Sequence, residues 1–282
     1  MPQTINTNLT SLNAQRNLNA SQLSLSTAMQ RLSSGLRVNS AKDDAAGLAI
    51  AERMNTQVRG MAVAMRNAND GISMSQVAEG ALSKVGDALQ RMRELALQAR
   101  NATNSESDKE SLQKEFKELQ DEIARVLGGT AFNGKRILGA DAGSFTFQIG
   151  ANTTPDDIVE IGFTNLASNA DIGSVVGTSA SIGSGVNVGS IASVIGYIDT
   201  AINRINDTRA IYGATQSRFE AIISNLQVAA ENQTAARSRI MDADYAAETA
   251  NLSRAQILQQ AGTAMVAQAN QLPQQVLRLL GN

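Results

Sequence analysis

The chain has 282 residues, enough for one or two domains with a real core, and a net charge of −2. It contains no histidine, cysteine or tryptophan, which excludes imidazole catalysis, thiolate nucleophiles, zinc-finger ligand sets and disulfide frameworks. The near-neutral charge argues against bulk attraction to nucleic acid, and no segment approaches the roughly 18 apolar residues of a membrane span. We therefore expect no cofactor or metal, no nucleic-acid partner and no membrane insertion.

A first helix is predicted from about residue 5 to residue 36, where apolar residues recur at helical spacing between Asn, Gln and Ser. Gly35, near its end, is able to take the left-handed conformation that ends many helices. The apolar stripe repeats every seven residues, the period of a helix that buries a narrow seam against another helix. Its members are Leu18, Leu25 and Leu32.

A second helix is predicted after Ser40, because Ser40 and Asp43 form a capping-box pattern. Its apolar residues alternate steps of three and four, but the gap between Ile72 and Leu82 breaks the repeat, as a stutter would. Asn69-Asp70-Gly71 has the pattern of a tight turn, so the residues alone favour a break and a continuous helix equally. The core-domain seam that we predict on this helix consists of Leu48, Val58, Met65, Ile72, Leu82 and Leu89.

The middle of the chain changes character. A third helix is predicted from a Ser107–Glu110 cap to the Gly128-Gly129 pair. Residues 145–149 and 159–163 then alternate apolar and polar side chains, which predicts a β-hairpin with a longer loop. Residues 166–189 are rich in Gly, Ser, Ala and Val and carry almost no charge. We expect a loop or a short, weakly structured insertion there.

Helical spacing returns from residue 191 to residue 226, and a last helix is predicted from about residue 244 to the end, with a kink at Pro273. The last helix carries another seven-residue apolar repeat. Its members are Leu258, Met265, Leu272 and Leu279. Matched repeats at both ends predict a self-assembly seam, through which the termini pair with each other and with copies of the same chain.

Aromatic residues are confined to the region between Phe116 and Tyr245, so both ends have only aliphatic and small side chains to bury. Ordering the backbone costs about 1–2 kcal/mol per residue, which makes such helices marginal alone. We therefore expect the two ends to be largely disordered until other copies surround them.

Candidate catalytic groups are sparse. Asp43-Asp44 and Asp156-Asp157 are adjacent carboxylates, but neighbours on a helix do not face each other, and the partners that acid–base catalysis needs are missing. Gly183-Ser184-Gly185 lacks the Lys-Ser/Thr that follows in a phosphate-binding loop. The sequence therefore favours an assembly protein over an enzyme.

Several long strings of this sequence closely resemble bacterial flagellin. They are RLSSGLRVNSAKDDAAG (31–47), RNANDGIS (66–73), SRAQILQQAG (253–262) and the ending through Leu280. The resemblance covers roughly residues 1–165 and 190–282. It implies a short flagellin that lacks the large outer domains of longer members.

The implied fold is mainly α, with long helices from both termini forming coiled-coil bundles, a small β-hairpin region and a short central insertion. In the family the second helix runs on through Asn69-Asp70-Gly71, so the resemblance implies no break there. The implied domains are an inner terminal coiled-coil domain (1–43 plus 240–282), a helical core domain with the β-hairpin (44–165 plus 190–239) and a reduced variable loop (166–189).

The implied function is that of an extracellular structural subunit, which polymerises into the flagellar filament for swimming motility. Flagellins pass unfolded through a dedicated export channel without a cleaved signal, and no secretory signal is visible in the first residues here. The implied partners are many copies of the chain itself, an export chaperone, the filament cap and hook-junction proteins.

The resemblance also implies a partner outside the bacterium. Flagellins similar to this chain are contacted on their second long helix by an innate immune receptor, Toll-like receptor 5. The matching positions are Gln90, Arg91, Leu95 and Glu115, which all have the residue types of the family pattern. Activation of the receptor does not follow from the match, because the same face is expected to pack between subunits in the filament.

Three alternatives stay open at this point. A hook–filament junction protein would share the terminal seams, and the capacity to form long filaments alone would exclude it. A flagellin with a metalloprotease insertion needs His-Glu-x-x-His, and this chain has no histidine. A helical secreted adhesin would remain monomeric when seeded with filament fragments.

Overall fold

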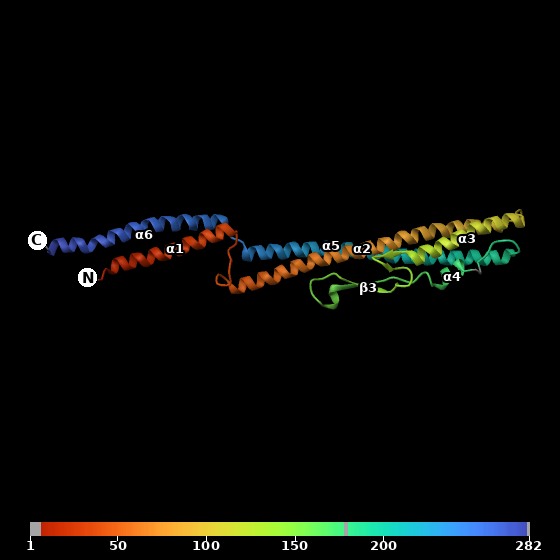
Figure 1. Cartoon of the computed structure of the whole chain (residues 1–282), viewed down its shortest axis with the longest axis horizontal. Coiled ribbons are helices and arrows are strands. Elements are labelled where there is room, and N and C mark those ends of the chain that lie inside the picture. The colour runs from red at the N-terminus through yellow and green to blue at the C-terminus, as the bar shows by residue number, and fades with distance from the viewer. Residues whose placement is uncertain (1–6, 178–179, 281–282) are drawn as a thin grey trace. The chain divides into compact units, whose positions relative to one another are not determined.

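The computed structural model describes residues 7–177 and 180–280, the side chains of residues 272–280 excepted. The chain is mainly helical, as predicted, with small two-stranded sheets between long helices (Figure 1). The helices are α1 (Leu9–Ser34), α2 (Ala45–Ala99), α3 (Glu106–Gly129), α4 (Ala170–Val176), α5 (Val188–Met241) and α6 (Tyr245–Leu280). The strands are β1 (Ala131–Phe132), β2 (Lys135–Arg136), β3 (Ser144–Gln148) and β4 (Ile158–Gly162).

The contacts within the chain divide it into two compact units. Unit 1 comprises Met1–Thr56 and Glu231–Asn282, and unit 2 comprises Gln57–Ala230. The boundaries fall inside α2 and α5. The domain division that the sequence predicts places them nearer the termini, at about residues 43 and 240, and it stays a prediction.

In unit 1, α1 begins at an Asn8 cap, whose side-chain oxygen accepts from the Ser11 N–H. It ends at Gly35, which has φ +72° and donates its N–H to the Arg31 carbonyl, so the predicted left-handed C-cap is confirmed. The start of α6 is capped by Asp244, whose carboxylate accepts from the Ala246 N–H at 2.9 Å. The helix then continues past Pro273 to Leu280.

The start of α2 differs from the prediction. Asp43 does accept from the Ser40 N–H at 3.0 Å, but this contact shapes a turn that precedes the helix. The helical cap is Asp44, which accepts from the Gly47 N–H at 2.7 Å. Nearby, Val38, Ala51 and Met241 form a small apolar cluster of unit 1.

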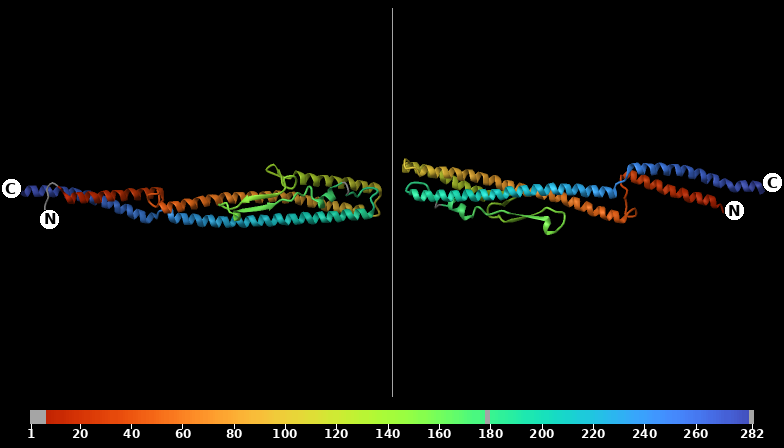
Figure 2. Two further views of the ribbon diagram at one scale, coloured as in Figure 1. Left: turned by 90° about the horizontal axis from the view of Figure 1, so that it is seen from below. Right: turned by 180° about the vertical axis from the view of Figure 1, so that it is seen from behind.

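Unit 2 holds the main core. The β3–β4 hairpin packs on α2 and α5 (Figure 2): Asn67 donates to the Gln148 carbonyl at 3.0 Å, and the Phe147 and Phe219 rings meet edge to face at 5.7 Å. The hairpin itself is confirmed, with Ser144 opposite Gly162 and Gln148 opposite Ile158.

Helix α2 is unbroken at Asn69-Asp70-Gly71, so the turn suggested by the local residues is wrong and the continuous helix implied by the family is confirmed. Gly71 is needed here for packing: a Cβ at this position would lie 2.9 Å from Cζ of Phe219. The absence of a side chain at Gly71 therefore lets the Phe219 ring pack against the helix, and the helix does not end there.

The predicted stutter between Ile72 and Leu82 is also wrong. The buried positions of α2 continue through this stretch at alternating steps of three and four. They are Ala64, Ala68, Gly71, Ser75, Ala78, Leu82, Val85, Leu89, Met92, Ala96 and Ala99, and Met74 and Leu95 are buried beside them. The first half of this seam consists of small residues, which a count of large apolar side chains does not register.

Two further boundaries need correction. Helix α3 is capped by a Ser105–Asp108 capping box, two residues before the predicted Ser107–Glu110 pair. The short hairpin of β1 and β2 was not predicted, although Asn133-Gly134 between its strands is a strong turn signal. Both residues have positive φ, +48° and +80°, as a tight hairpin turn requires.

The described residues of the segment 166–189 do not form the loop or weakly structured insertion that the sequence predicted. They include α4, and several of their apolar side chains are fully buried in the core of unit 2. Polar side chains of α3 also hold their backbone. The bonds join Gln120 Nε2 to the carbonyls of Val175 (2.6 Å) and Ala180 (3.1 Å), the Ile182 N–H to Gln113 (2.6 Å), and the Gly185 N–H to Glu106 (2.8 Å).

Candidate assembly surfaces

Helices α1 and α6 lie side by side and antiparallel in unit 1 (Figure 1). Asn8 donates to the Ala269 carbonyl at 2.7 Å near one end, and Arg31 faces Glu248 at 3.9 Å near the other. Each helix turns a regular heptad of its least exposed residues to the other. On α1 these are Ser11, Ala14, Leu18, Ser21, Leu25, Ala28 and Leu32, and on α6 they are Glu248, Leu252, Ala255, Gln259, Gly262, Val266 and Ala269.

The predicted self-assembly seam therefore divides into two groups. Its α1 members, Leu18, Leu25 and Leu32, lie half-buried against α6. On α6, Leu258 and Met265 are 50% and 61% exposed, one residue away from the positions that face α1. The side chains of Leu272 and Leu279 lie outside the described residues, and a role of these four residues between copies stays a prediction.

The α1/α6 interface is thin and partly polar. Its fully buried apolar residues are alanines such as Ala28 and Ala255, and Gly262 brings the backbones together, since a Cβ there would lie 3.1 Å from Leu18 Cδ1. Ser11 donates to the Asn270 side chain across the pair at 2.7 Å. Burying methyl groups contributes far less than burying leucine or aromatic side chains, so this pair gains little from packing alone.

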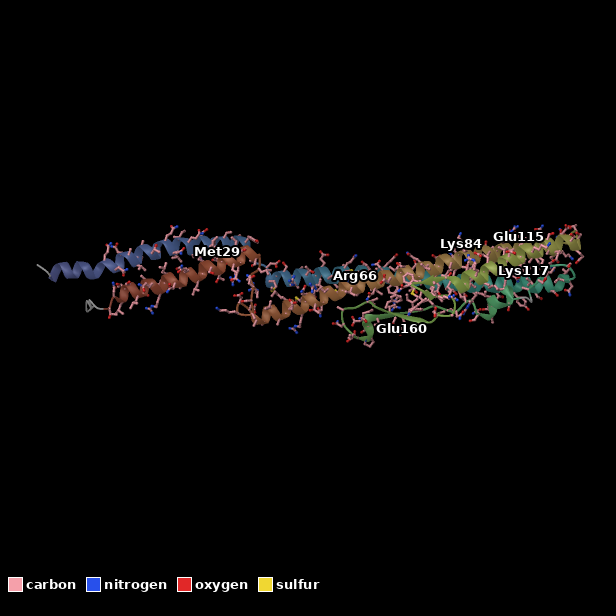
Figure 3. The ribbon with its side chains drawn as sticks, in the orientation of Figure 1. Met29, Arg66, Lys84, Glu115, Lys117 and Glu160 are labelled. Carbon is pink, nitrogen blue, oxygen red and sulfur yellow. The ribbon has the colours of Figure 1, made fainter. Side chains whose placement is uncertain are left out.

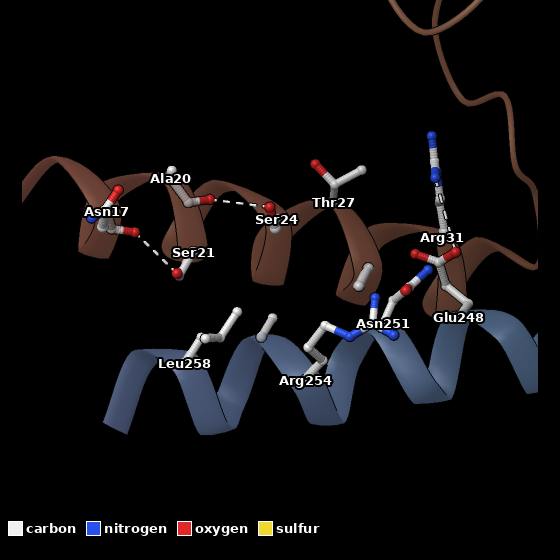
Figure 4. Close-up of a pocket in the computed structure, with 12 residues that line it drawn as sticks. Asn17, Ala20, Ser21, Ser24, Thr27, Arg31, Glu248, Asn251, Arg254 and Leu258 are labelled. Carbon is white, nitrogen blue, oxygen red and sulfur yellow. Dashed lines mark hydrogen bonds and ion pairs between the residues drawn. The ribbon is translucent and has the colours of Figure 1, made fainter. Parts of the chain in front are cut away.

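A groove runs along one flank of the pair (Figure 4). Its more polar part has Asn17, Ser24 and Thr27 on α1, with Asn251 and Arg254 on α6. Its more apolar part, of roughly 420 Å³, continues from Asn17, Ser21 and Leu258, which both parts share. It is lined further by Thr10, Asn13, Ala14, Leu18, Ala261, Gly262 and Met265.

The residues of the predicted core-domain seam on α2 differ in how deeply they are buried. Leu82 and Leu89 are fully buried in the core of unit 2, and Ile72 packs against that core. Leu48 packs on the small cluster of unit 1, and Val58 and Met65 are half-buried. Leu82 and Leu89 thus occupy central positions of the buried heptad, whereas Met65 and Ile72 lie next to Ala64 and Gly71, which occupy them.

The candidate receptor face lies on α2 and α3 of unit 2. Arg91 donates to Glu115 at 2.8 Å and to Glu94 at 3.0 Å, and these bonds, first the one to Glu115, raise the pKa of its guanidinium. Gln90 is exposed, as are Arg91 and Glu115, the last labelled in Figure 3. Leu95 is only 1% exposed. It packs in the core beneath this face, and its part in a receptor contact stays a prediction.

Neither a membrane-spanning helix nor a metal-ligand group is found in the part of the chain that the structure describes. Its helices include none long and apolar enough to cross a bilayer. The same residues hold no group of three carboxylates that could ligate a metal ion. The surfaces that matter here are those along the terminal helices and the exposed face around Arg91.

Comparisons with known proteins agree with the pattern of terminal helices. Residues 5–142 match the family model described as the bacterial flagellin N-terminal helical region, and residues 195–280 match the corresponding C-terminal helical region. The chain is 44% identical to a flagellin of Halalkalibacterium halodurans over 98% of its own length and 99% of the relative's. It is 42% identical to a flagellin of Xenorhabdus nematophila over 99% and 100% of the two chains.

A solved structure from Vibrio parahaemolyticus, described as a putative flagellar hook-associated protein, shares the fold. Its TM-score is 0.58, and the match covers 71% of this chain and all of the other at 12% sequence identity. At that identity the likeness concerns the fold alone.

Proposed function

Because this chain belongs to the bacterial flagellins, which makes it a structural subunit of the extracellular flagellar filament and not an enzyme, we propose that its terminal helices acquire their stable structure only among other copies of the chain. Polymerisation with itself follows from the family. The adhesin, metalloprotease and hook-junction alternatives are set aside by the same relatives.

The observation that carries the proposal is the composition of the α1/α6 interface. Its heptad positions hold alanine, serine, glycine, glutamine and a carboxylate besides a few half-buried leucines, while several other leucines and methionines of the same helices remain exposed. A helix pair of this kind gains little on pairing and still loses backbone entropy of about 1–2 kcal/mol per residue. Burial of the exposed side chains by neighbouring copies would supply the missing stabilisation.

We further propose that the predicted seam residues of α6, from Leu258 to Leu279, make contacts between copies. Head-to-tail contacts that do not close generate helical filaments, so each added subunit would order the arms of the one before it. Folding and polymerisation would then be one event, as in other coupled folding and binding reactions. This supports export in an unfolded state through the flagellar channel.

The remaining partners belong to the same proposal. An export chaperone would cover the exposed apolar residues of the arms before assembly, since such residues invite aggregation. The filament cap and the hook-junction proteins would offer the first and last surfaces for terminal helices to pack against. Both proposals rest on the family and on the exposed residues of α1 and α6.

Hydrogen exchange tests the main proposal directly. In the monomer, backbone amides of α1 and α6 should exchange within seconds while those of α2 and α5 within unit 2 are protected, and polymerisation should protect both sets. The control is the unit 2 core, whose protection should be similar in the two states. Slow exchange of α1 and α6 in the monomer would contradict the proposal.

A second candidate function is recognition by Toll-like receptor 5, favoured by the exposed Arg91 with its two carboxylate partners. Its planar guanidinium is suited to bidentate contacts with a partner. Arg91→Ala should reduce receptor signalling by monomers, whereas Arg125→Ala, which removes a similar exposed pair with Glu122 on α3, should not. Equal signalling by both variants and by the unaltered chain would exclude this face.

A further inference from the structure

We propose that the groove along the α1/α6 pair receives the outward face of α1 from a second copy. That face consists of Leu9, Leu12 and Leu23 and is called the leucine face here. The inference rests on the proposed function and deepens it, because it names which surface of one copy meets which surface of the next.

The leucine face is the most exposed apolar feature of α1. Leu9 and Leu23 are 70% and 73% exposed, and Leu12 is 48% exposed. Leu12 and Leu23 are eleven residues apart in the sequence, which is about three helical turns, so they lie on one face of the helix. Neither belongs to the heptad that contacts α6. The α1/α6 pair therefore leaves these leucines without the apolar cover that would remove them from water.

The groove offers complementary chemistry. Its floor and walls are largely apolar: Leu18 and Gly262 lie where the helices meet, and Leu258 and Met265 stand half to two-thirds exposed along the α6 side. At the floor, Gly262 lets the two helices approach closely, because a Cβ there would lie 3.1 Å from a Leu18 methyl. The room for entering leucine side chains is the apolar part of the groove, of roughly 420 Å³.

The groove also continues an interface that exists in the single chain. Leu18 contributes to the α1/α6 heptad and to the groove wall at once. A helix laid into the groove would thus extend a two-helix seam to three helices.

The leucine face and the groove of one copy cannot contact each other. The groove is lined on the α1 side by Asn13 and Asn17, which lie about 80–140° around the helix axis from Leu12 and Leu23. A leucine face entering the groove must come from another molecule. The contact is heterologous, so each added copy leaves one groove and one leucine face free, as growth of a filament requires.

The size of the exposed surface also suits a copy of the same chain. Seven large apolar side chains of α1 and α6 are about half to three-quarters exposed in unit 1. In a heterologous contact, the leucine face of one copy and the groove of the next would each bury members of this set. They are Leu9, Leu12, Leu23, Met29, Ile257, Leu258 and Met265.

Charge-pair complementation tests the proposal. Leu23→Glu places a charge on the leucine face, and Met265→Lys places the opposite charge in the groove. Both positions are exposed in the monomer, so neither change should affect its folding. Each variant alone should elongate seeds of unaltered filament about tenfold or more slowly, because an unpaired charge would be buried.

A one-to-one mixture of the two variants should restore elongation, because the carboxylate introduced at position 23 of one copy then meets the ammonium introduced at position 265 of its neighbour. The double variant L23E/M265K should elongate alone for the same reason. Gln22→Glu and Thr263→Lys, exposed changes of the same charge on the same helices and away from both surfaces, should elongate like the unaltered chain.

Three results would overturn the proposal. The first is unimpaired elongation of both single variants. The second is impairment by Met265→Lys but not by Leu23→Glu, which would mean that another segment fills the groove, and the third is impairment by both variants without rescue in the mixture. In all three the unaltered chain still polymerises. If the unaltered chain itself failed to elongate seeds, the proposed function would fail, and the two failures are thus distinguishable.

Discussion

The α1/α6 pair of unit 1 and the α2/α5 pair of unit 2 are both antiparallel helix pairs with heptad seams, yet they bury different residues. The seam of α2 and α5 holds Leu82, Leu89, Tyr212 and Phe219, each at most 1% exposed. The seam of α1 and α6 holds mainly alanine and polar residues. The same repeat therefore specifies where helices pair, while the side-chain size at the seam decides whether the pair is stable alone.

The largest effect is expected from truncating an aromatic residue in unit 2. Phe219 is fully buried between Gly71 and Phe147. Phe219→Ala should lower the free energy of unfolding by about 3–5 kcal/mol, because it removes buried surface and leaves a cavity. Urea unfolding of the monomer followed by circular dichroism measures this.

The matched change in unit 1 sharpens the comparison. Leu23→Ala, at a 73% exposed position, should alter the monomer by less than about 0.5 kcal/mol while it slows polymerisation. A loss of monomer stability equal to that of Phe219→Ala would show that the two pairs do not differ as described.

Alkaline pH should weaken unit 2 through Tyr212. Burial raises the pKa of this phenol to about 12, above the usual value of about 10. Below pH 10 the phenol is protonated in both states, but between about pH 10 and 12 only the unfolded chain releases the proton. The free energy of unfolding should therefore fall by on the order of 2–3 kcal/mol across that window. Tyr212→Phe should abolish this fall, whereas Tyr197→Phe, at a 46% exposed site, should preserve it.

The segment after β4 should behave as part of the unit 2 core. Gln120 is buried and donates to the carbonyls of Val175 and Ala180. Gln120→Leu should cost about 1–3 kcal/mol, since buried carbonyls lose their donor. Gln98→Leu, at an exposed position of α2, is the control. Removal of residues 170–186 should destabilise unit 2 as well; unchanged unfolding after that deletion would restore the interpretation of a dispensable loop.

Much of the architecture could be predicted from the sequence because it depends on local signals. The Gly35 cap, the alternation in β3 and β4 and the placement of every aromatic residue except Tyr245 in unit 2 all follow from residue type and spacing. The exact residues that form the helix seams could not be predicted from these local signals. On α2 the buried positions include Ala64 and Gly71, one residue before the larger Met65 and Ile72 that the pattern favoured.

An offset of one residue, in the opposite direction along the chain, occurs on α6, and the reason is shared. Gln259 and Val266 face α1, whereas Leu258 and Met265, one residue earlier, carry the visible repeat. Where small residues let two helices approach closely, large apolar residues are displaced to the flank of the seam. A repeat of leucines then marks a surface beside the pair, which in a polymer is where further helices are expected to pack.

The smallest predicted effect concerns glycines of α2, and it has the sharpest control. A Cβ at Gly80 would meet nothing within 4 Å, whereas one at Gly71 would lie 2.9 Å from the Phe219 ring. Gly80→Ala should raise the stability of the monomer by up to about 1 kcal/mol through helix propensity alone. Gly71→Ala should lower it, because the ring has no room to retreat in the close-packed core. Comparison of Gly71→Ala with Gly80→Ala thus tests which of the two glycines is needed for packing within the single chain. If Gly80→Ala stabilises the monomer but impairs polymerisation, that glycine serves a contact between copies, as the exposed leucines of α1 are proposed to do.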